Sequence, residues 1–196
     1  MVPAMINEDI HHDWRQHLQR VWSGGDHDEL AWRLGPVEEV LPRLRIRRVT
    51  PERPGKPWVF ATVGAWEAVD SRDRLEFMLL TPDERAEYLE LLTMLACFHA
   101  DPRFSLRFGG TVNIGRPWTD DSRAHELYVS PAYCLPEDLR CHHCCDGGHI
   151  DIAWLVPVTP EEAALARSGR GDELEALLDL ARANVVDPRR SSVVAV

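Results

Sequence analysis

The segment "HIDIAWLVPVTPEE", residues 149–162, joins a run of apolar residues directly to a helix start. The run from His149 to Val158 is rich in β-branched residues, which predicts a buried strand. After it, Thr159 suits an N-cap, Pro160 suits the first helical position and Glu162 can complete a capping box. The segment therefore predicts a strand that runs straight into a helix.

The same arrangement occurs once more, where "LEFMLL" (residues 75–80) is followed by "TPDE". Here Thr81, Pro82 and Glu84 predict a second capped helix. The segment "WVFATVGAW" (residues 58–66) predicts a preceding strand, and the short polar stretch between the two strands indicates an antiparallel pair. Because the flanking sequences differ, we interpret the repeat as reused local chemistry and not as a duplicated domain.

The remaining patterns complete the prediction of the fold. Apolar residues at helical spacing predict a helix over residues 7–22, a shorter one around residues 30–34 and a final one over residues 171–184. The alternation in "RLRIRR" (residues 43–48) predicts a strand with one solvated face. Strand–helix alternation is too sparse for a doubly wound sheet, so we expect a single α+β domain, with a mixed or antiparallel sheet and packed helices. Its expected parts are an N-terminal helical segment (residues 1–44) and the main domain (residues 45–192).

Composition restricts the class of function. The chain has 196 residues, of which 44% are hydrophobic and 28% charged, as in ordinary globular proteins. It has no apolar run long enough for a membrane span and no signal-peptide pattern, so a cytoplasmic location without membrane partners is expected. The formal net charge of −10 argues against nucleic acid as a partner. It suits a basic protein partner, or solubility alone.

The segment "CHHCCDGGH" (residues 141–149) is the one cluster of chemically active residue types. The spacing of Cys141 and Cys144 is half of a zinc-binding pattern, and His149 is a candidate third ligand. A redox pair and a Cys–His nucleophile are alternatives, although Asp-Gly-Gly after the cysteines disfavours the helix that a redox pair usually opens. The remaining reading is a mobile loop with reduced thiols, which ends in a turn.

No established catalytic constellation is present, so the sequence leans towards a non-enzymatic protein. The loop "GRPWTDDS" (residues 115–122) offers Trp118 as a contact anchor for a protein partner, unless this loop is tucked onto the core. Asp120 and Asp121 beside it would attract a basic partner. These three residues are the predicted partner-binding residues.

Four segments together resemble the suppressor-of-fused-like (SUFU-like) domain family in its bacterial branch, over about residues 45–192. They are "RRVTPERPGKPWVFATVGAWEA", "RLEFMLLTP", "DGGHIDIAWLVPVTPEEAALAR" and "DPRRSS". The resemblance implies a mixed α/β domain that binds another protein. Animal relatives hold a transcription factor inactive, and bacterial relatives are often encoded beside secreted toxins and are thought to be immunity proteins.

The segment "CHHCC" departs from that family, in which this place is ordinarily a plain loop. The departure leaves open drift in a tolerant loop, a lineage-specific metal site or an acquired activity. Two functions therefore stand side by side at this point. One is a non-catalytic immunity protein without a cofactor, and the other is a zinc- or other metal-dependent enzyme or sensor that uses residues 141–149.

Overall fold

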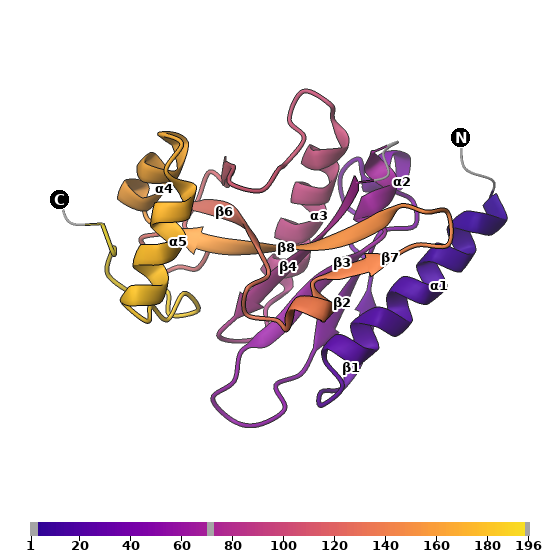
Figure 1. The fold of residues 1–196 in the computed structure, drawn as a ribbon, viewed down its shortest axis with the longest axis horizontal. Coiled ribbons are helices and arrows are strands. Elements are labelled where there is room, and N and C mark those ends of the chain that lie inside the picture. The colour runs from indigo at the N-terminus through magenta and orange to yellow at the C-terminus, as the bar shows by residue number, and fades with distance from the viewer. Residues whose placement is uncertain (1–3, 70–72, 195–196) are drawn as a thin grey trace. The chain divides into compact units, whose positions relative to one another are not determined.

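The computed structural model describes residues 4–69 and 73–194 (Figure 1). The described chain divides into two compact units, which are treated separately below. The first unit contains residues 1–105 and 131–153, and the second contains residues 106–130 and 154–196. Strand β8 (His149–Val158) runs through both units.

The first unit begins with a long helix and continues with a meander of strands. Its elements are α1 (Ala4–Val21), β1 (His27–Leu30), α2 (Val37–Val40), β2 (Arg45–Val49), β3 (Trp58–Val63), the 3-10 helix η1 (Ala65–Ala68), β4 (Asp73–Thr81), α3 (Ala86–Ala100), the 3-10 helix η2 (Glu137–Leu139) and β7 (Cys141–His143). The second unit contains β5 (Thr111–Asn113), β6 (Glu126–Pro131), the second half of β8, α4 (Pro160–Arg167) and α5 (Gly171–Leu180).

Hydrogen bonding orders the strands β1-β2-β3-β4-β8 in the first unit, with β7 also paired to β8, and β8-β6-β5 in the second. The pairs β1–β2, β2–β3, β3–β4, β5–β6 and β7–β8 are antiparallel. The predicted α+β class with packed helices and a mostly antiparallel sheet is confirmed. So is the predicted antiparallel pair of β3 and β4, although residues 70–72 of the polar segment between them lie outside the described residues.

Helices α1 and α3 lie on opposite faces of the sheet in the first unit. Arg47 of β2 donates a hydrogen bond to the Arg15 carbonyl of α1 (2.9 Å). Phe77 of β4 packs against His99 of α3, with ring centroids 5.1 Å apart. The β2–β3–β4 register puts Arg47 on the face of Met78, and consecutive strand residues such as Phe77 and Met78 point to opposite faces. The helical stripe predicted from the sequence is confirmed in α1, where Ile10, Trp14 and Leu18 are fully buried.

The short helix predicted around residues 30–34 is wrong, because residues 27–30 form strand β1. The strand pairs with β2 and places Glu29 opposite Arg47. Arg47 donates to the Glu29 carboxylate at 2.6 Å, and Arg48 pairs with Asp28 at 2.5 Å. The polar side chains of β1 are therefore held by the alternating arginines of β2, an interaction that local helix spacing does not reveal.

The two Thr-Pro-x-Glu segments behave differently. Thr159 forms the predicted capping box with Glu162 at the start of α4. Thr81, in contrast, ends β4, and α3 begins only at Ala86 with no side-chain cap, so the predicted cap at Thr81 is wrong. Asp83, between the two, accepts hydrogen bonds from Arg85 and Tyr88 (2.8 and 2.9 Å) and holds the intervening residues outside the helix.

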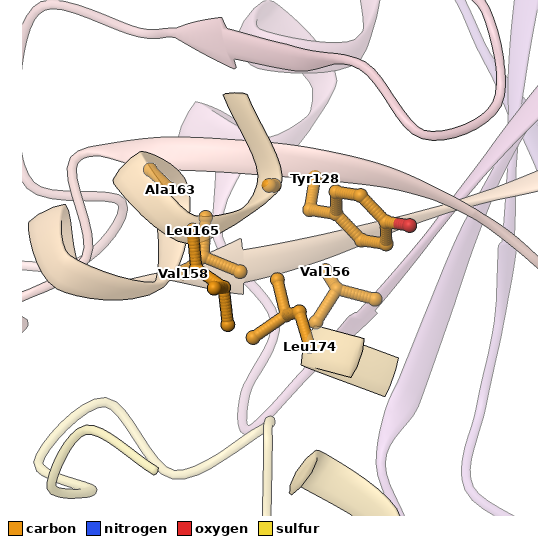
Figure 2. Packing of buried hydrophobic residues seen from close by; sticks show 7 residues of the cluster. Tyr128, Val156, Val158, Ala163, Leu165 and Leu174 are labelled. Carbon is orange, nitrogen blue, oxygen red and sulfur yellow. The ribbon is translucent and has the colours of Figure 1, made fainter. Parts of the chain in front are cut away.

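The second unit has its own apolar core (Figure 2). Side chains from β6, β8, α4 and α5 meet in it: Tyr128, Val156, Val158, Ala163, Leu165, Ala166 and Leu174. At its edge the Glu162 carboxylate is completely buried and accepts two hydrogen bonds of 2.6 Å from Arg190. Arg190 also donates to the Pro157 carbonyl (2.8 Å), so the "DPRRSS" segment is tied to the end of β8.

Within the described ranges, none of the helices is long and apolar enough to cross a bilayer. The boundary predicted near residue 45 falls inside the first compact unit, because β1 before it and β2 after it belong to one ladder.

Candidate functional site

The Cys/His segment forms a β-hairpin. Its first strand, β7, pairs with the start of β8 and places Cys141 opposite Asp151 and His143 opposite His149. The prediction of a loop is therefore wrong for residues 141–143, because their backbone groups are engaged by β8, which the isolated sequence of β7 does not show.

The predicted Asp-Gly-Gly turn is confirmed. The Cys144 N–H donates to the Gly148 carbonyl at 2.8 Å, and the Gly147 N–H donates to the Cys144 carbonyl at 3.1 Å. Gly147 has φ = 80°, a left-handed conformation that residues with a side chain rarely adopt. The glycine thus lets the chain reverse between β7 and β8.

Two of the three predicted metal ligands, Cys141 and His149, share a partner in this hairpin, and the third, Cys144, is buried. Burial, and then a hydrogen bond with Asp151, raise the pKa of Cys141 to about 12. His149 Nε2 lies 3.3 Å from the same Asp151 carboxylate. Cys144 is buried, and this burial raises the pKa of its thiol although Arg74 acts in the opposite direction.

Among residues 4–69 and 73–194, no group of three His, Cys, Asp or Glu side chains is placed to hold a metal ion. The zinc site at Cys141, Cys144 and His149 stays a prediction, and metal analysis of the purified protein tests it. All five cysteines lie in the described part and are free thiols. Redox and nucleophilic cysteines depend on a lowered thiol pKa. The thiol pKa values of Cys97, Cys141 and Cys144 are instead raised.

Arg74 fastens the hairpin turn to the body of the first unit. Its guanidinium group is buried and makes two hydrogen bonds with Asp146, of 2.5 and 3.2 Å. The same group lies over the ring of Trp66 in η1, 4.9 Å from the ring centroid. The hydrogen bond from Arg74 lowers the pKa of Asp146, so the pair is ionic at neutral pH. These contacts join the hairpin turn to β4 and η1.

Helix α1 packs on the hairpin through a layer of rings. Trp14 stacks on His17 and His17 contacts His142 of β7, each pair with ring centroids 5.2 Å apart. His17 Nε2 donates to the Leu139 carbonyl at 3.0 Å. Burial lowers the pKa of His17 to about 4, so the ring is neutral at pH 7. His142, the histidine of the Cys/His segment that contacts α1, therefore has a packing role.

The predicted partner-binding residues lie in the second unit and differ in exposure. Trp118 is only 6% exposed and lines a small internal hollow with Ala124 and Val185, so its loop is tucked in and the indole does not offer an exposed anchor. Asp120 and Asp121 are exposed, and Asp121 forms an ion pair with Arg189 at 2.5 Å. A role for these three residues in binding a partner stays a prediction.

An exposed aromatic patch on the first unit was not predicted. It consists of Met94 (51% exposed), Phe98 (37%) and Phe104 (46%), which we call the α3 patch. Phe98 and Phe104 stack with their centroids 4.9 Å apart, and Arg103 lies over the Phe104 ring at 5.2 Å. The i, i+4 spacing of Met94 and Phe98 places both residues on one side of α3, which is a signal that the sequence offers. Because α3 is apolar on most sides, the sequence does not distinguish this exposed pair from the buried stripe.

Comparisons with known proteins agree with this architecture. The family model described as suppressor of fused protein (SUFU) matches residues 42–191. The crystal structure of a SUFU homologue from Neisseria gonorrhoeae superposes with a TM-score of 0.83 at 30% identity, over 96% of this chain and 98% of that one. A search of curated protein sequences gave no match.

Two more distant structures share the fold. The Sufu–Fu complex matches with a TM-score of 0.67 at 15% identity, over 94% of this chain and 92% of that one. Drosophila Suppressor of Fused matches with a TM-score of 0.60 at 16% identity, over 91% of this chain and 50% of its own length. This chain therefore corresponds to half of the Drosophila protein.

Proposed function

This chain belongs to the suppressor of fused family, and from that membership we propose that it is a non-catalytic protein-binding module. A related fold is seen in the Sufu–Fu complex, whose name records a protein partner. The shared fold supports protein binding as the general function, while the partner of this chain is a separate question.

The observation that carries the proposal is the α3 patch. Large apolar side chains that lie together on a surface mark interaction sites more often than isolated ones do. Here two aromatic rings and a methionine are exposed together, and Arg103 covers one ring. Aromatic, methionine and arginine side chains are the types that are enriched at protein interfaces. The patch therefore has the composition of a binding surface.

We further propose that the partner is a toxin domain, which this chain neutralises as an immunity protein in the cytoplasm. The resemblance to the bacterial branch supports this finer function, and the acidic net charge suits a basic toxin. Such a protein acts by covering the active site of the toxin, so it needs an adhesive surface and no reacting groups.

Co-expression with a toxin domain encoded in the same gene cluster tests both proposals. We expect the chain to restore growth of the toxin-producing cell and to form a stable complex with the toxin domain. The double substitution Phe98→Ser/Phe104→Ser should weaken the complex at least about tenfold, because anchor residues of interfaces cost 1.4 kcal/mol or more when truncated.

Phe108→Ser is the matched control, because Phe108 is also an exposed phenylalanine (40%) but belongs to the second unit and is not one of the three residues of the patch. If the control and the double variant lose binding equally, the effect comes from non-specific hydrophobic association and not from the α3 patch. Failure of the wild-type chain to bind or neutralise any toxin of its cluster would remove the immunity function and leave protein binding to be tested with other partners.

A further inference from the structure

A pocket on the first unit gathers basic side chains although the chain as a whole is acidic. It has a volume of about 330 Å³ and is lined by α1 and by the segment that leads into β2: Glu8, His11, His12, Arg15, Arg43 and Arg45. The chain carries 22 lysine and arginine residues and 32 acidic residues, so three arginines against one glutamate among the lining residues reverse the overall balance. Charge of this kind, gathered in a concave site, attracts an anion.

Two of the arginines are oriented by carboxylates at the rim. Arg15 uses Nε to donate to both oxygens of Glu29, at 2.9 and 3.0 Å. Arg43 donates to Glu67, which also bonds His11 at 2.9 Å. Burial acts to raise the pKa values of Glu29 and Glu67, but the hydrogen bonds from these partners outweigh it and lower both pKa values. Both carboxylates are therefore ionised.

The rim carboxylates are shared, which limits how far they neutralise the arginines. Glu29 also accepts a hydrogen bond from Arg47 at 2.6 Å, so one negative charge serves two guanidinium groups. Within the part of the chain that the structure describes, the side chain of Arg15 donates through Nε, and both terminal nitrogens remain as donors.

Arg45 has no carboxylate partner among the described residues. Its Nη1 donates to the Leu44 carbonyl at 2.7 Å and to the Pro42 carbonyl at 3.5 Å, which orients the guanidinium plane. These bonds leave Nε and Nη2, the edge that holds a carboxylate or phosphate in a bidentate manner. Because the side chain is already oriented, little conformational entropy is lost when an anion binds.

We propose that this pocket is an oxyanion-binding site, in which Arg45 makes the bidentate contact and Arg15 adds a second charge. The ligand chemistry is a carboxylate or phosphate group with two acceptor oxygens. Its sources are an acidic peptide segment or free inorganic phosphate. The site does not depend on the protein-binding function proposed above, since none of its residues belongs to the α3 patch.

Calorimetric titration of the full chain at low salt tests the site, with three probes. These are a short peptide of alternating glutamate and glycine, the same peptide with glutamine, and inorganic phosphate. We expect the glutamate peptide or phosphate to bind while the glutamine peptide does not. Phosphate that displaces the glutamate peptide shows that both occupy one site, and binding of only one of them identifies the source.

Arg45→Gln should weaken binding at least about tenfold, as expected for the loss of a bidentate charged hydrogen bond. Arg48→Gln is the matched control. Arg48 lies on the same strand three residues after Arg45, so its side chain points to the opposite face of the sheet. There it pairs with Asp28 and Glu84. Arg45→Lys keeps the positive charge but cannot make the bidentate contact, so its affinity for the anion should lie between those of the wild type and Arg45→Gln. Equal weakening by Arg45→Gln and Arg48→Gln, or no binding of either anion to the wild-type chain, overturns the proposal.

Discussion

The Glu162–Arg190 pair is a buried ion pair in the second unit. The carboxylate is completely buried, and besides the two bonds from Arg190 it accepts backbone hydrogen bonds from Thr159 and Val193, both of 2.9 Å. A buried charge with this many partners is tolerated only while they remain, because removal of one partner leaves the charge uncompensated.

Arg190→Ala should therefore lower the free energy of unfolding by roughly 3 kcal/mol. Its neighbour Arg189 pairs with Asp121 on the exposed surface, so Arg189→Ala is the control and should leave the denaturation midpoint unchanged. Urea denaturation of the two variants makes the comparison. Similar midpoints would show that the Glu162–Arg190 pair contributes no more than a surface ion pair.

The buried Glu76 makes stability depend on pH. Its carboxylate accepts from the Gly64 N–H at 2.6 Å and from the Thr62 hydroxyl, yet burial raises the pKa of Glu76 from 4.5 to about 7. Between these values the folded protein binds more protons than the unfolded chain, so stability falls as the pH rises from about 4.5 to 7.

We expect Glu76→Gln to remove this loss, which has a slope of at most about 1.4 kcal/mol per pH unit. Burial lowers the pKa values of His17 and His99 to about 4, which gives the opposite slope between 4 and 6.5. For this reason the measurement is the difference between wild type and variant in denaturation series from pH 4.5 to 8. Parallel curves would show that Glu76 titrates as it does in the unfolded chain.

At the scale of elements, cross-strand ion pairs add to the backbone pairing that joins strand β1 to β2. Arg47 is buried and bonds Glu29, while the other cross-strand ion pair, Arg48 with Asp28, is more exposed. An edge strand with four residues has few backbone bonds of its own, so the buried side-chain pair is needed to hold it.

Glu29→Gln should lower the free energy of unfolding by about 1 to 2 kcal/mol and speed hydrogen exchange in residues 27–30. Asp28→Asn removes a charge from the same strand at the exposed pair and serves as the control, with a smaller effect on both. Hydrogen-exchange mass spectrometry of the two variants decides between them. Unchanged exchange in Glu29→Gln would show that backbone pairing alone holds β1.

At the scale of the whole molecule, the net charge of −10 should govern the rate at which a basic partner associates. Asp120 and Asp121 contribute two exposed negative charges in one loop. Their replacement by lysine should slow association with a basic toxin domain at low salt and reduce the dependence of the rate on salt. Stopped-flow or surface-binding kinetics measure both.

The control for this substitution is Glu137→Lys/Asp138→Lys, which changes the charge of another exposed acidic pair by the same amount. If both double variants slow association equally, the effect belongs to the overall charge and not to the 115–122 loop. An unchanged rate in the Asp120/Asp121 variant would remove these two residues from the predicted partner-binding surface.

Most of the fold could be predicted because its signals are local. The predicted strand over residues 149–158 and the capping box at Thr159 are confirmed, since apolar content and cap chemistry act within a few residues. The predicted cap at Thr81 was wrong because Arg48 of β2 pairs with Glu84, the residue expected to complete the capping box. The predicted helix near residue 30 was wrong because Arg47 and Arg48 engage the polar side chains of β1.

The sequence by itself determined the α+β class and the antiparallel β3–β4 pair, because alternation, caps and turns are encoded by adjacent residues. The family followed from the resemblance of four segments to known members. Only the tertiary structure decided which polar and aromatic side chains are engaged. It paired the Cys/His segment with β8 and α1, buried Trp118, exposed Phe98 and Phe104, and gathered Arg15, Arg43 and Arg45 around one pocket. Burial and charge at each of these positions depend on residues distant in the chain, so no local pattern could specify them.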